Sequence, residues 1–456
     1  MLTILNPAHG TTLAELPEDT HESVHAKYRA ARAAQPAWAA TPLATRLTAI
    51  RRFRAGIVEH LERLAAVLTS EVGKPIRQSR NELNGLLGRL DFFLAQTEAT
   101  LAPRQVHEEA GLRETITHEP LGVVANISAW NYPYFVGSNV FVPALLTGNS
   151  VLYKPSEYAT LTGLEIGKLL HAGGVPQDVF SVLVGGGRVG IELLKEPVDG
   201  VFFTGSYPTG ARIAQAVAPR MIRLQLELGG KDPTYVCDDV DVAAAAASLA
   251  DGAMYNTGQS CCSVERIYVH AAVYDAFVAA FVKEVEGFKV GDPTHEDSYI
   301  GPLTRAPQVK VLQMQVAEAT AKGARVLTGG HALDRPGGHW FAPTVLVDVN
   351  HEMAVMREES FGPVIGIQKV ADDAEAVRLM NDTDYGLTAG VYTRTEARAR
   401  AILAQVEAGS VYWNCCDRVS PRLPWSGVKH SGLGLTLSTY GIEAFTRPKA
   451  WHLRTA

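Results

Sequence analysis

The sequence predicts an α/β protein with two doubly wound parallel-sheet domains and a small additional β element. Short apolar segments alternate with helix-like segments from about residue 121, which is the pattern of a parallel sheet with crossover helices. The alternation restarts after residue 230 and therefore predicts a second domain. Two strand-like segments, 104–120 and 441–456, fit neither domain and account for the additional element.

The first hundred residues are predicted to be helical. Apolar residues recur there at steps of three and four, which places them on one face of a helix. Pro42 lies near the start of this helix, where a proline costs least. The face is predicted to pack against the core and comprises Leu47, Ile50, Phe53, Ile57, Leu61, Leu64 and Leu68.

Five short apolar segments predict the strands of the first sheet. Residues 120–153 include the first of them and contain no charged side chain, so a membrane span is one interpretation of this stretch. Its asparagines and prolines would leave polar groups unpaired in lipid, and we expect a buried strand followed by a buried helix instead. The five segments are "LGVVANISA", "NSVLYKPS", "VFSVLVGGG", "GVFFTGS" and "RLQLEL".

Another five segments predict the second sheet, with helices between them that extend through Met254 and Val285. We expect the boundary between the two domains close to Leu228–Gly230. No low-complexity linker or internal repeat is visible. The segments are "PTYVCDD", "RIYVH", "PVIGIQKV", "GLTAGVYT" and "GSVYWNC".

Composition and charge exclude several classes of protein. With 46% apolar residues the chain can bury a large core without disulfides, and a net charge of −6 argues against a general nucleic-acid surface. The five cysteines are odd in number and lack framework spacing, so we expect reduced thiols in a cytosol-like compartment. No metal site is expected. The N-terminal residues lack the features of a signal peptide, which favours a cytoplasmic protein.

Two adjacent cysteines, Cys261 and Cys262, occur in the segment "YNTGQSCCSVER". Neighbouring cysteines seldom bond to each other, because disulfide geometry would distort the peptide between them. One of the two thiols is therefore a candidate nucleophile. Their position alone does not identify which of the two thiols is the nucleophile.

Two glycine turns lie between a predicted strand and a predicted helix. "GGGRVG" (185–190) matches GxGxxG, but no acidic residue follows about 20 positions later, where the dinucleotide fingerprint requires one. "FFTGSYPTG" (202–210) could hold a phosphate on the amides of its helix start. Lys154 and Glu157 follow another strand and suit a ribose, although a solvated ion pair is the alternative. Together these features favour a nucleotide site.

Two further polar side chains lie in apolar surroundings. Glu227 ends a predicted strand before Gly-Gly, where partial burial would raise its pKa and make it a usable base; a water-facing carboxylate is the alternative. Asn131, in "SAWNYPY", either completes a turn or donates to a developing oxyanion. A thiol, a carboxylate, an amide and a nucleotide site together suit the oxidation of a carbonyl compound through a thioester.

With these residues in view, the chain resembles the aldehyde dehydrogenase superfamily from about Asn6 to its C-terminus. The resemblance implies a hydrolytic, non-acylating enzyme that oxidises an aldehyde to a carboxylic acid with NAD, with NADP as the alternative cofactor. Its motifs, in chain order, are "WNYP" (130–133), "FTGS" (203–206), "LELGGK" (226–231), "NTGQSC" (256–261), "ESFGP" (359–363) and "PWSGVKHSGLG" (424–434).

The resemblance assigns a role to each candidate residue. Cys261 is implied as the nucleophile, Glu227 as the base for the hydrolytic water, and Asn131, with the Cys261 backbone amide, as the oxyanion hole. The implied cofactor contacts are Ile127, Ser128, Ala129, Trp130, Lys154, Ser156, Glu157, Gly187, Gly190, Phe203, Thr204, Gly205, Ser206, Leu228, Gly229, Glu359 and Phe361. The implied substrate pocket comprises Tyr132, Ser260, Cys262, Arg418, Val419 and Trp425.

The resemblance also implies a division of the chain and an assembly. A Rossmann-like NAD(P)-binding domain would comprise 1–100 and 121–228, and a catalytic domain 229–432. The segments 101–120 and 433–456 would form a β oligomerisation element of a homodimer or homotetramer. The implied partner is a small-molecule aldehyde, with no nucleic acid and no membrane.

Several positions depart from the family pattern and bear on substrate choice. Trp425 and Ser426 replace a usual Phe and Gly, and Arg418 and Arg422 lie in a loop that, by resemblance, borders the substrate entrance. The two arginines suit the carboxylate of an ω-semialdehyde, and solvated loop residues are the alternative. A CoA-acylating enzyme and a catalytically silent binding or structural protein are further alternatives. The complete set of catalytic residues argues against both.

Overall fold

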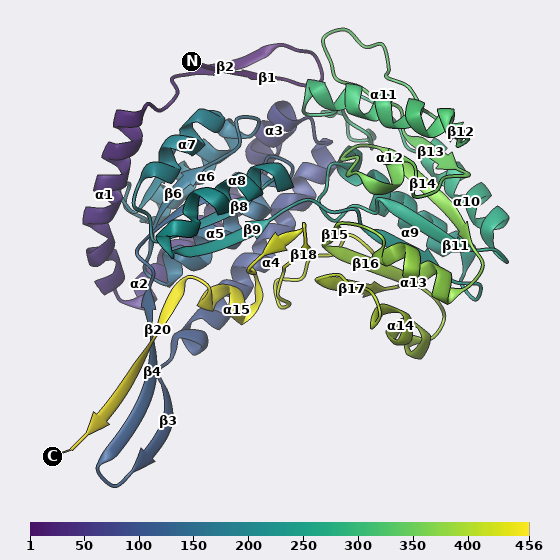
Figure 1. Ribbon diagram of the computed structural model, residues 1–456. Helices are drawn as coiled ribbons and strands as arrows, with labels where there is room; N and C mark the ends of the chain where they lie inside the picture. Colours follow the sequence, from purple (N-terminus) through teal and green to yellow (C-terminus); the bar gives the residue numbers. More distant parts are fainter. Residues whose placement is uncertain (456) are drawn as a thin grey trace.

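The computed structural model describes residues 1–455, which form two α/β units and a three-stranded sheet that projects below the first unit (Figure 1). The first unit is built on a six-stranded sheet with the order β19-β9-β8-β5-β6-β7. All neighbours are parallel except β19 and β9. The strands are β5 (Val123–Ile127), β6 (Ser150–Lys154), β7 (Phe180–Val182), β8 (Gly200–Thr204), β9 (Arg223–Glu227) and β19 (Gly432–Leu433).

The strand order of this sheet reverses between β5 and β8. In such doubly wound sheets, ligands bind outside the carboxyl ends of the strands at the point of reversal. The segment 120–153 forms β5 and the buried helix α5, which confirms the prediction for the uncharged stretch. The helices of the unit are α5 (Pro133–Leu146), α6 (Thr160–Gly173), α7 (Gly187–Lys195) and α8 (Tyr207–Val217).

Alternate side chains of β5 pack against opposite layers, as a strand buried on both faces requires. Val123 and Ala125 pack in one cluster with Val24 of α1 and Val189 of α7. Val124 belongs to the cluster on the other face, which includes residues of α2 to α6. The first sheet is therefore a central layer between two helical layers.

The N-terminal helices correct one prediction. The apolar stripe from 47 to 68 belongs to two helices, because the chain bends at His60 (φ −111°, ψ 17°), which ends one helix and precedes the next. No proline or glycine marks this bend. Instead, α2 packs on α6 and α3 packs on both α4 and α6, so tertiary contacts set the change of direction. The helices are α1 (His21–Ala40), α2 (Leu43–Glu59), α3 (Leu61–Val72) and α4 (Ile76–Leu101).

The second unit contains a seven-stranded sheet with the order β12-β13-β14-β11-β10-β16-β17, in which only β12 and β13 are antiparallel neighbours. Its strands are β10 (Pro233–Val236), β11 (Arg266–His270), β12 (Arg325–Thr328), β13 (Thr344–Val347), β14 (Val364–Val370), β16 (Thr388–Tyr392) and β17 (Ser410–Trp413). Its helices are α9 (Val242–Met254), α10 (Tyr274–Glu286), α11 (Ala306–Ala321), α12 (Ala354–Arg357), α13 (Asp373–Asn381) and α14 (Glu396–Leu403). The five predicted strands are all present.

The projecting sheet joins the two segments that fit neither unit. A hairpin of β3 (Arg104–Glu109) and β4 (Leu112–Pro120) pairs with β20 (Thr446–Arg454) in the order β20-β4-β3. Residues 432–445 do not join this sheet. β19 pairs with β9, and α15 (Ser438–Glu443) packs against α4, so this part of the chain returns to the first unit before β20 begins.

Three short β features were not predicted. β1 (Leu2–Leu5) pairs with β2 (Thr12–Leu16), and β15 (Tyr385–Gly386) pairs with β18 (Val428–Lys429). The edge strand β12 and its neighbour β13 also escaped prediction. Among the described residues, no helix combines the length and the apolar character that crossing a membrane requires.

Candidate active site

The carboxyl ends of four neighbouring parallel strands bring most of the predicted cofactor residues to one edge of the first sheet. Ile127 at the end of β5 lies beside Lys154 of β6 and Phe203 of β8. Thr204 of β8 lies beside Glu227 of β9. The residues that follow these ends share the same edge: Ser128, Ala129 and Trp130 after β5, Ser156 and Glu157 after β6, Gly205 and Ser206 after β8, and Leu228 and Gly229 after β9.

Two helix N-termini also lie at this edge. Gly187 is the first residue of α7, and Ser206 is the N-cap of α8. The free amides of such helix starts favour anions. A Cβ added at Gly190, near the start of α7, would meet the stem of Lys154 at 3.7 Å.

The ammonium group of Lys154 is buried and has one protein partner in the described chain, the Pro155 carbonyl oxygen at 3.1 Å. Its burial lowers the pKa of the lysine, because the charged form loses water. Glu157, two residues further, accepts a hydrogen bond from Ser156 at 3.3 Å. Among residues 1–455, no carboxylate lies within 4.0 Å of this buried ammonium, which suits a ligand with hydroxyl or phosphate oxygens.

The cysteine loop follows a short 3₁₀ turn, Tyr255–Gly258, and is tied to the end of β5. The Asn131 side-chain amide donates to the Gln259 carbonyl at 3.2 Å. Asn256, in the left-handed region at φ 54°, donates to the same carbonyl and to the Asn131 carbonyl, at 3.0 and 3.2 Å. Two buried amides therefore tie the loop that carries Cys261 to the segment of Asn131.

The Gly-Gly pair after Glu227 allows close approach of two other segments. A Cβ at Gly229 would lie 2.5 Å from the Glu359 carboxylate, and one at Gly230 would lie 2.6 Å from the Cys261 carbonyl oxygen. The Gly230 amide also donates to Glu359 at 3.0 Å. Side chains at either position would push the cysteine loop or Glu359 away from the sheet edge.

The segment that carries Glu359 and Phe361 belongs to the second unit and is fixed by Glu265. This carboxylate accepts from the amides of Ser360 and Phe361 and from the Lys231 ammonium, at 3.1, 3.0 and 2.7 Å. Phe361 takes a positive φ of 47° and its ring meets Trp130 edge-on, with 5.5 Å between centroids. Residues from both units thus face the same edge of the first sheet.

The Glu227 side chain is buried at the end of β9. Its carboxylate accepts a hydrogen bond from the Thr436 hydroxyl at 2.7 Å. Burial raises the pKa of Glu227 to about 8, although hydrogen bonds from Thr436 and Trp425 and the charge of Arg89 oppose the rise. A carboxyl group with this pKa exchanges protons near neutral pH, which suits a general base.

A cavity of about 560 Å³ opens onto Cys261. It lies between α4, the start of α5, the cysteine loop and the segment 417–425. All six residues predicted for the substrate pocket line it: Tyr132, Ser260, Cys262, Arg418, Val419 and Trp425.

The two adjacent cysteines have different environments in this cavity wall. Cys261 is partly exposed, whereas Cys262 is buried and donates to the Asp417 carboxylate at 2.9 Å. A hydrogen bond with Cys261, burial and the Asp417 charge raise the pKa of the Cys262 thiol well above its usual value. Cys262 therefore stays protonated and is a poor nucleophile.

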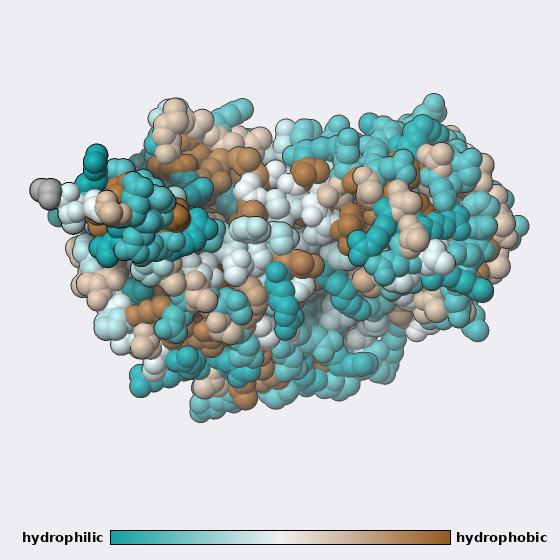
Figure 2. All heavy atoms as spheres, turned by 90° about the horizontal axis from the view of Figure 1, so that it is seen from below, coloured by the Kyte–Doolittle hydropathy of each residue, from teal (hydrophilic) through white to brown (hydrophobic). Residues whose placement is uncertain are grey.

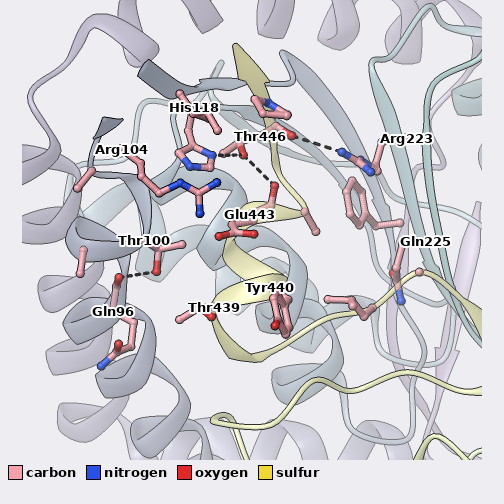
Figure 3. Close-up of a pocket in the computed structure, with 18 of the residues that line it drawn as sticks. Gln96, Thr100, Arg104, His118, Arg223, Gln225, Thr439, Tyr440, Glu443 and Thr446 are labelled. Atoms are coloured by element: carbon pink, nitrogen blue, oxygen red, sulfur yellow. Dashed lines mark hydrogen bonds between the residues drawn. The ribbon is translucent and has the colours of Figure 1, made fainter. Parts of the chain in front are cut away.

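A larger cavity of about 980 Å³ lies at the base of the projecting sheet, between α4, β9 and α15 (Figure 3). Some of its polar side chains bond to neighbouring protein groups. Thr446 contacts His118 at 3.2 Å and donates to the Glu443 carbonyl at 2.9 Å (Figure 3). None of the predicted catalytic residues lines it, so the candidate site is the smaller cavity.

Sequence reasoning missed two charged residues of the smaller cavity. Asp417 precedes Arg418 in the loop expected at the substrate entrance but belongs to no motif, and its enclosure in the cavity wall raises its pKa to about 6. Arg89 lies on α4, on the buried face that also carries Leu86, Leu90 and Phe93. A charged residue inside an apolar helical face was the signal that could have revealed it.

A doubly wound sheet with anion-binding helix starts, beside a cysteine loop and a buried carboxylate, defines a nucleotide-dependent enzyme with a thiol at its site. The chain belongs to the aldehyde dehydrogenase family, whose family model matches residues 1–451. This confirms the resemblance drawn from the motifs.

Individual relatives support the same membership. The chain is 38% identical over 460 residues to the 3,6-anhydro-alpha-L-galactose dehydrogenase of Streptomyces coelicolor, covering 100% of this chain and 93% of the relative. A solved NADP-dependent enzyme from E. coli is similar with a TM-score of 0.97 and 33% identity, covering 100% and 95%. An NAD-dependent aldehyde dehydrogenase from Sinorhizobium meliloti has a TM-score of 0.96 and 32% identity, covering 99% and 91%. The two-domain fold is thereby confirmed.

Proposed function

We propose that the protein oxidises an aldehyde to a carboxylic acid through a covalent thioester on Cys261, with NAD as the cofactor. The observation that carries the proposal is the hydrogen bond from Asn131 to the Gln259 carbonyl, at 3.2 Å. It holds Cys261 between the cofactor edge of the first sheet and a cavity large enough for a small aldehyde.

The residues present at the sheet edge fit a nicotinamide dinucleotide. Lys154 and Glu157 would hold the adenosine ribose, the starts of α7 and α8 the pyrophosphate, and Glu359 the nicotinamide ribose. The buried Lys154 ammonium, with a single carbonyl partner, supports this assignment. When bound, the cofactor supplies the hydride acceptor.

Cys261 would attack the aldehyde carbon, and its sulfur would form the new bond to carbon. The negative charge that develops on the aldehyde oxygen needs donors that are already in place. The Asn131 amide has two N–H groups and uses one of them on the Gln259 carbonyl, so the other can donate to the oxyanion together with the Cys261 backbone amide.

Glu227 would take a proton from the water that cleaves the thioester. In the structure its carboxylate is bonded to Thr436, and no hydrogen bond connects it to either cysteine among the described residues. We therefore assign Glu227 to the hydrolytic half-reaction, and the carboxylate would turn from Thr436 toward the cavity.

A panel of aldehydes with NAD tests the activity itself. Formation of NADH and of the matching carboxylic acid in equal amounts supports the proposal, and kcat/KM values rank the aldehydes. A well-folded protein that forms no NADH with any aldehyde would favour the alternative of a catalytically silent relative that acts by binding. Acyl transfer to CoA in place of acid formation would favour the acylating alternative.

We expect kcat/KM to be higher with NAD than with NADP. Glu157 would hydrogen-bond the free 2′-hydroxyl of NAD and repel the 2′-phosphate of NADP. Glu157→Gln should lower the NAD-to-NADP ratio by about tenfold, because the charge repulsion disappears while the hydrogen bond remains. Glu192→Gln, at a surface carboxylate of α7, is the matched control. Equal kcat/KM for both cofactors in the wild type would contradict this prediction.

We also propose that the projecting sheet assembles the chain into a homodimer or homotetramer. Apolar side chains are exposed on it, including Val106, Trp451 and Leu453. The edge strand β17 exposes Val411 and Trp413 in the same way. Apolar patches are visible among the polar areas on the lower face of the molecule (Figure 2). Exposed strand edges with apolar side chains are typical of surfaces that pair with another chain.

The double variant Trp451→Glu with Leu453→Glu should shift the protein toward smaller species in light scattering after gel filtration. Two charges at the centre of an apolar contact lose their hydration when subunits associate, which disfavours assembly. Met314→Glu, on the exposed face of α11, is the control and should leave the mass unchanged. An unchanged mass in the double variant would exclude the projecting sheet as the assembly surface.

A further inference from the structure

Helix α4 carries two buried charged residues beside the Cys261 cavity, and only one of them is neutralised. Glu82 accepts from the Lys74 ammonium and from the amides of Tyr134 and Phe135, the latter two at 2.9 and 3.4 Å. Glu82 and Lys74 thus form a closed ion pair.

Arg89, two turns further along α4, has no such partner. Its guanidinium donates once, from Nη1 to the Asn139 side-chain oxygen at 2.7 Å, and stacks over the Phe135 ring at 4.0 Å. Within the described chain, no Asp or Glu oxygen lies within 4.0 Å of it, and its Nε and Nη2 make no hydrogen bond. The residue is only 5% exposed, and it lines the cavity that holds Cys261.

A buried guanidinium without a counter-charge is unfavourable, and proteins normally pair it with a carboxylate or phosphate. Burial lowers the pKa of Arg89 to about 10, so the group is still charged at neutral pH. Its unused Nε and Nη2 form the edge of the guanidinium that binds a carboxylate through two parallel hydrogen bonds. Residues 1–455 provide no partner for this edge.

The other charges of the cavity decide how an anion would lie in it. Asp417 is bonded to Cys262, next to the nucleophile, and repels an anionic group from that end. Asp251 is engaged by the Tyr299 hydroxyl. Arg418 and Arg422 are exposed, so water screens them and neither provides a desolvated partner. The α4 end, with Arg89, is therefore the place where an anion is favoured.

We propose that Arg89 is the specificity-determining residue of this site and that the substrate is an oxo acid, with its aldehyde at Cys261 and its carboxylate on the Nε–Nη2 edge of Arg89. This rests on the proposed aldehyde oxidation and names its substrate class. It also moves the recognition of the anion from the exposed Arg418 and Arg422, where the sequence suggested it, to a buried residue of α4.

The test compares ω-oxo acids of four, five and six carbons with their uncharged methyl esters, as ratios of kcat/KM. The wild type should prefer the acid for at least one length. Arg89→Met should lower kcat/KM for that acid by about 10- to 100-fold, the loss expected for hydrogen bonds to a charged group, and leave the ester within about twofold. Arg89→Lys keeps the charge and loses the forked pair of donors. Its kcat/KM for the acid should lie between the values of the wild type and Arg89→Met. Arg422→Met is the matched control and should keep the wild-type ratio.

Equal losses for acid and ester in Arg89→Met would overturn the inference, because Arg89 would then act on the thiol or on the fold. No preference for any acid in the wild type would overturn it as well, while oxidation of the esters would leave the proposed function intact. A second readout needs no turnover. Succinate and adipate should slow the alkylation of Cys261 by iodoacetamide, followed by mass spectrometry, in the wild type and less in Arg89→Met. Equal protection in both proteins would contradict the role of Arg89 even if no aldehyde is oxidised.

Discussion

Cys261→Ala is expected to abolish NADH formation, whereas Cys262→Ala should retain most of it. Without the proposed nucleophile the covalent thioester cannot form, so kcat should fall on the order of 10⁴-fold or more. Cys262 is buried and its pKa is raised well above the usual value, so its thiol is not poised to attack. Its replacement removes a small buried side chain and a bond to Asp417, and the rate should fall by less than about tenfold.

Initial rates of NADH formation measure both variants, with thermal unfolding as the check that each is folded. Mass spectrometry of the wild type, quenched during turnover, should find the acyl group on the peptide with the modification at Cys261. If the Cys262 variant is the inactive one, the nucleophile is the second thiol. Cys415→Ala, at a partly exposed thiol of the same unit, is the control for general effects of cysteine removal.

The periodic parts of the fold were predictable from the sequence because their patterns arise from burial on two faces. β5, β6 and β8 are largely apolar segments, and each forms a buried parallel strand. The bend at His60 was not predictable, because it depends on which helices α2 and α3 meet in the folded protein and not on a local breaker. Short edge strands such as β12 lack a second buried face and left no clear pattern.

The candidate site also contains residues that the sequence could predict and residues that it could not. Residues in motifs lie at a strand end, as Glu227 does, or shortly after one, as Asn131 does, and the strand ends of a parallel sheet meet at one edge. Arg89 and Asp417 belong to no motif, and they lie far apart in the chain although they line one cavity. The role of each residue depends on which charged or hydrogen-bonding groups lie beside it in the folded protein. A sequence pattern does not show whether such a group is present.

Glu227→Gln is expected to separate the two half-reactions. The amide keeps the shape of the side chain and its bond from Thr436 but cannot take a proton from water. Acylation of Cys261 should still occur and give a burst of NADH near one equivalent per active subunit. The steady state should then be slower by about 10²- to 10⁴-fold, the usual contribution of general-base catalysis.

The pH dependence of deacylation provides an independent signature of the same carboxylate. Glu227 is a base only when ionised, and burial raises its pKa to about 8, so the deacylation rate should increase as the pH rises through about 8. This increase should vanish in Glu227→Gln. Thr436→Val removes a hydrogen bond that stabilises the ionised form, so the pKa should rise further and the profile should move to higher pH.

Stopped-flow absorbance of NADH decides which step Glu227 serves. A burst followed by a slow phase assigns the residue to hydrolysis of the thioester. Loss of the burst together with the steady state would instead assign it to the deprotonation of Cys261, because acylation itself would then fail. A steady state at the wild-type rate would remove Glu227 from the mechanism. The structure favours the first outcome, because the carboxylate is bonded to Thr436 at 2.7 Å and has no hydrogen bond to either cysteine in the described chain.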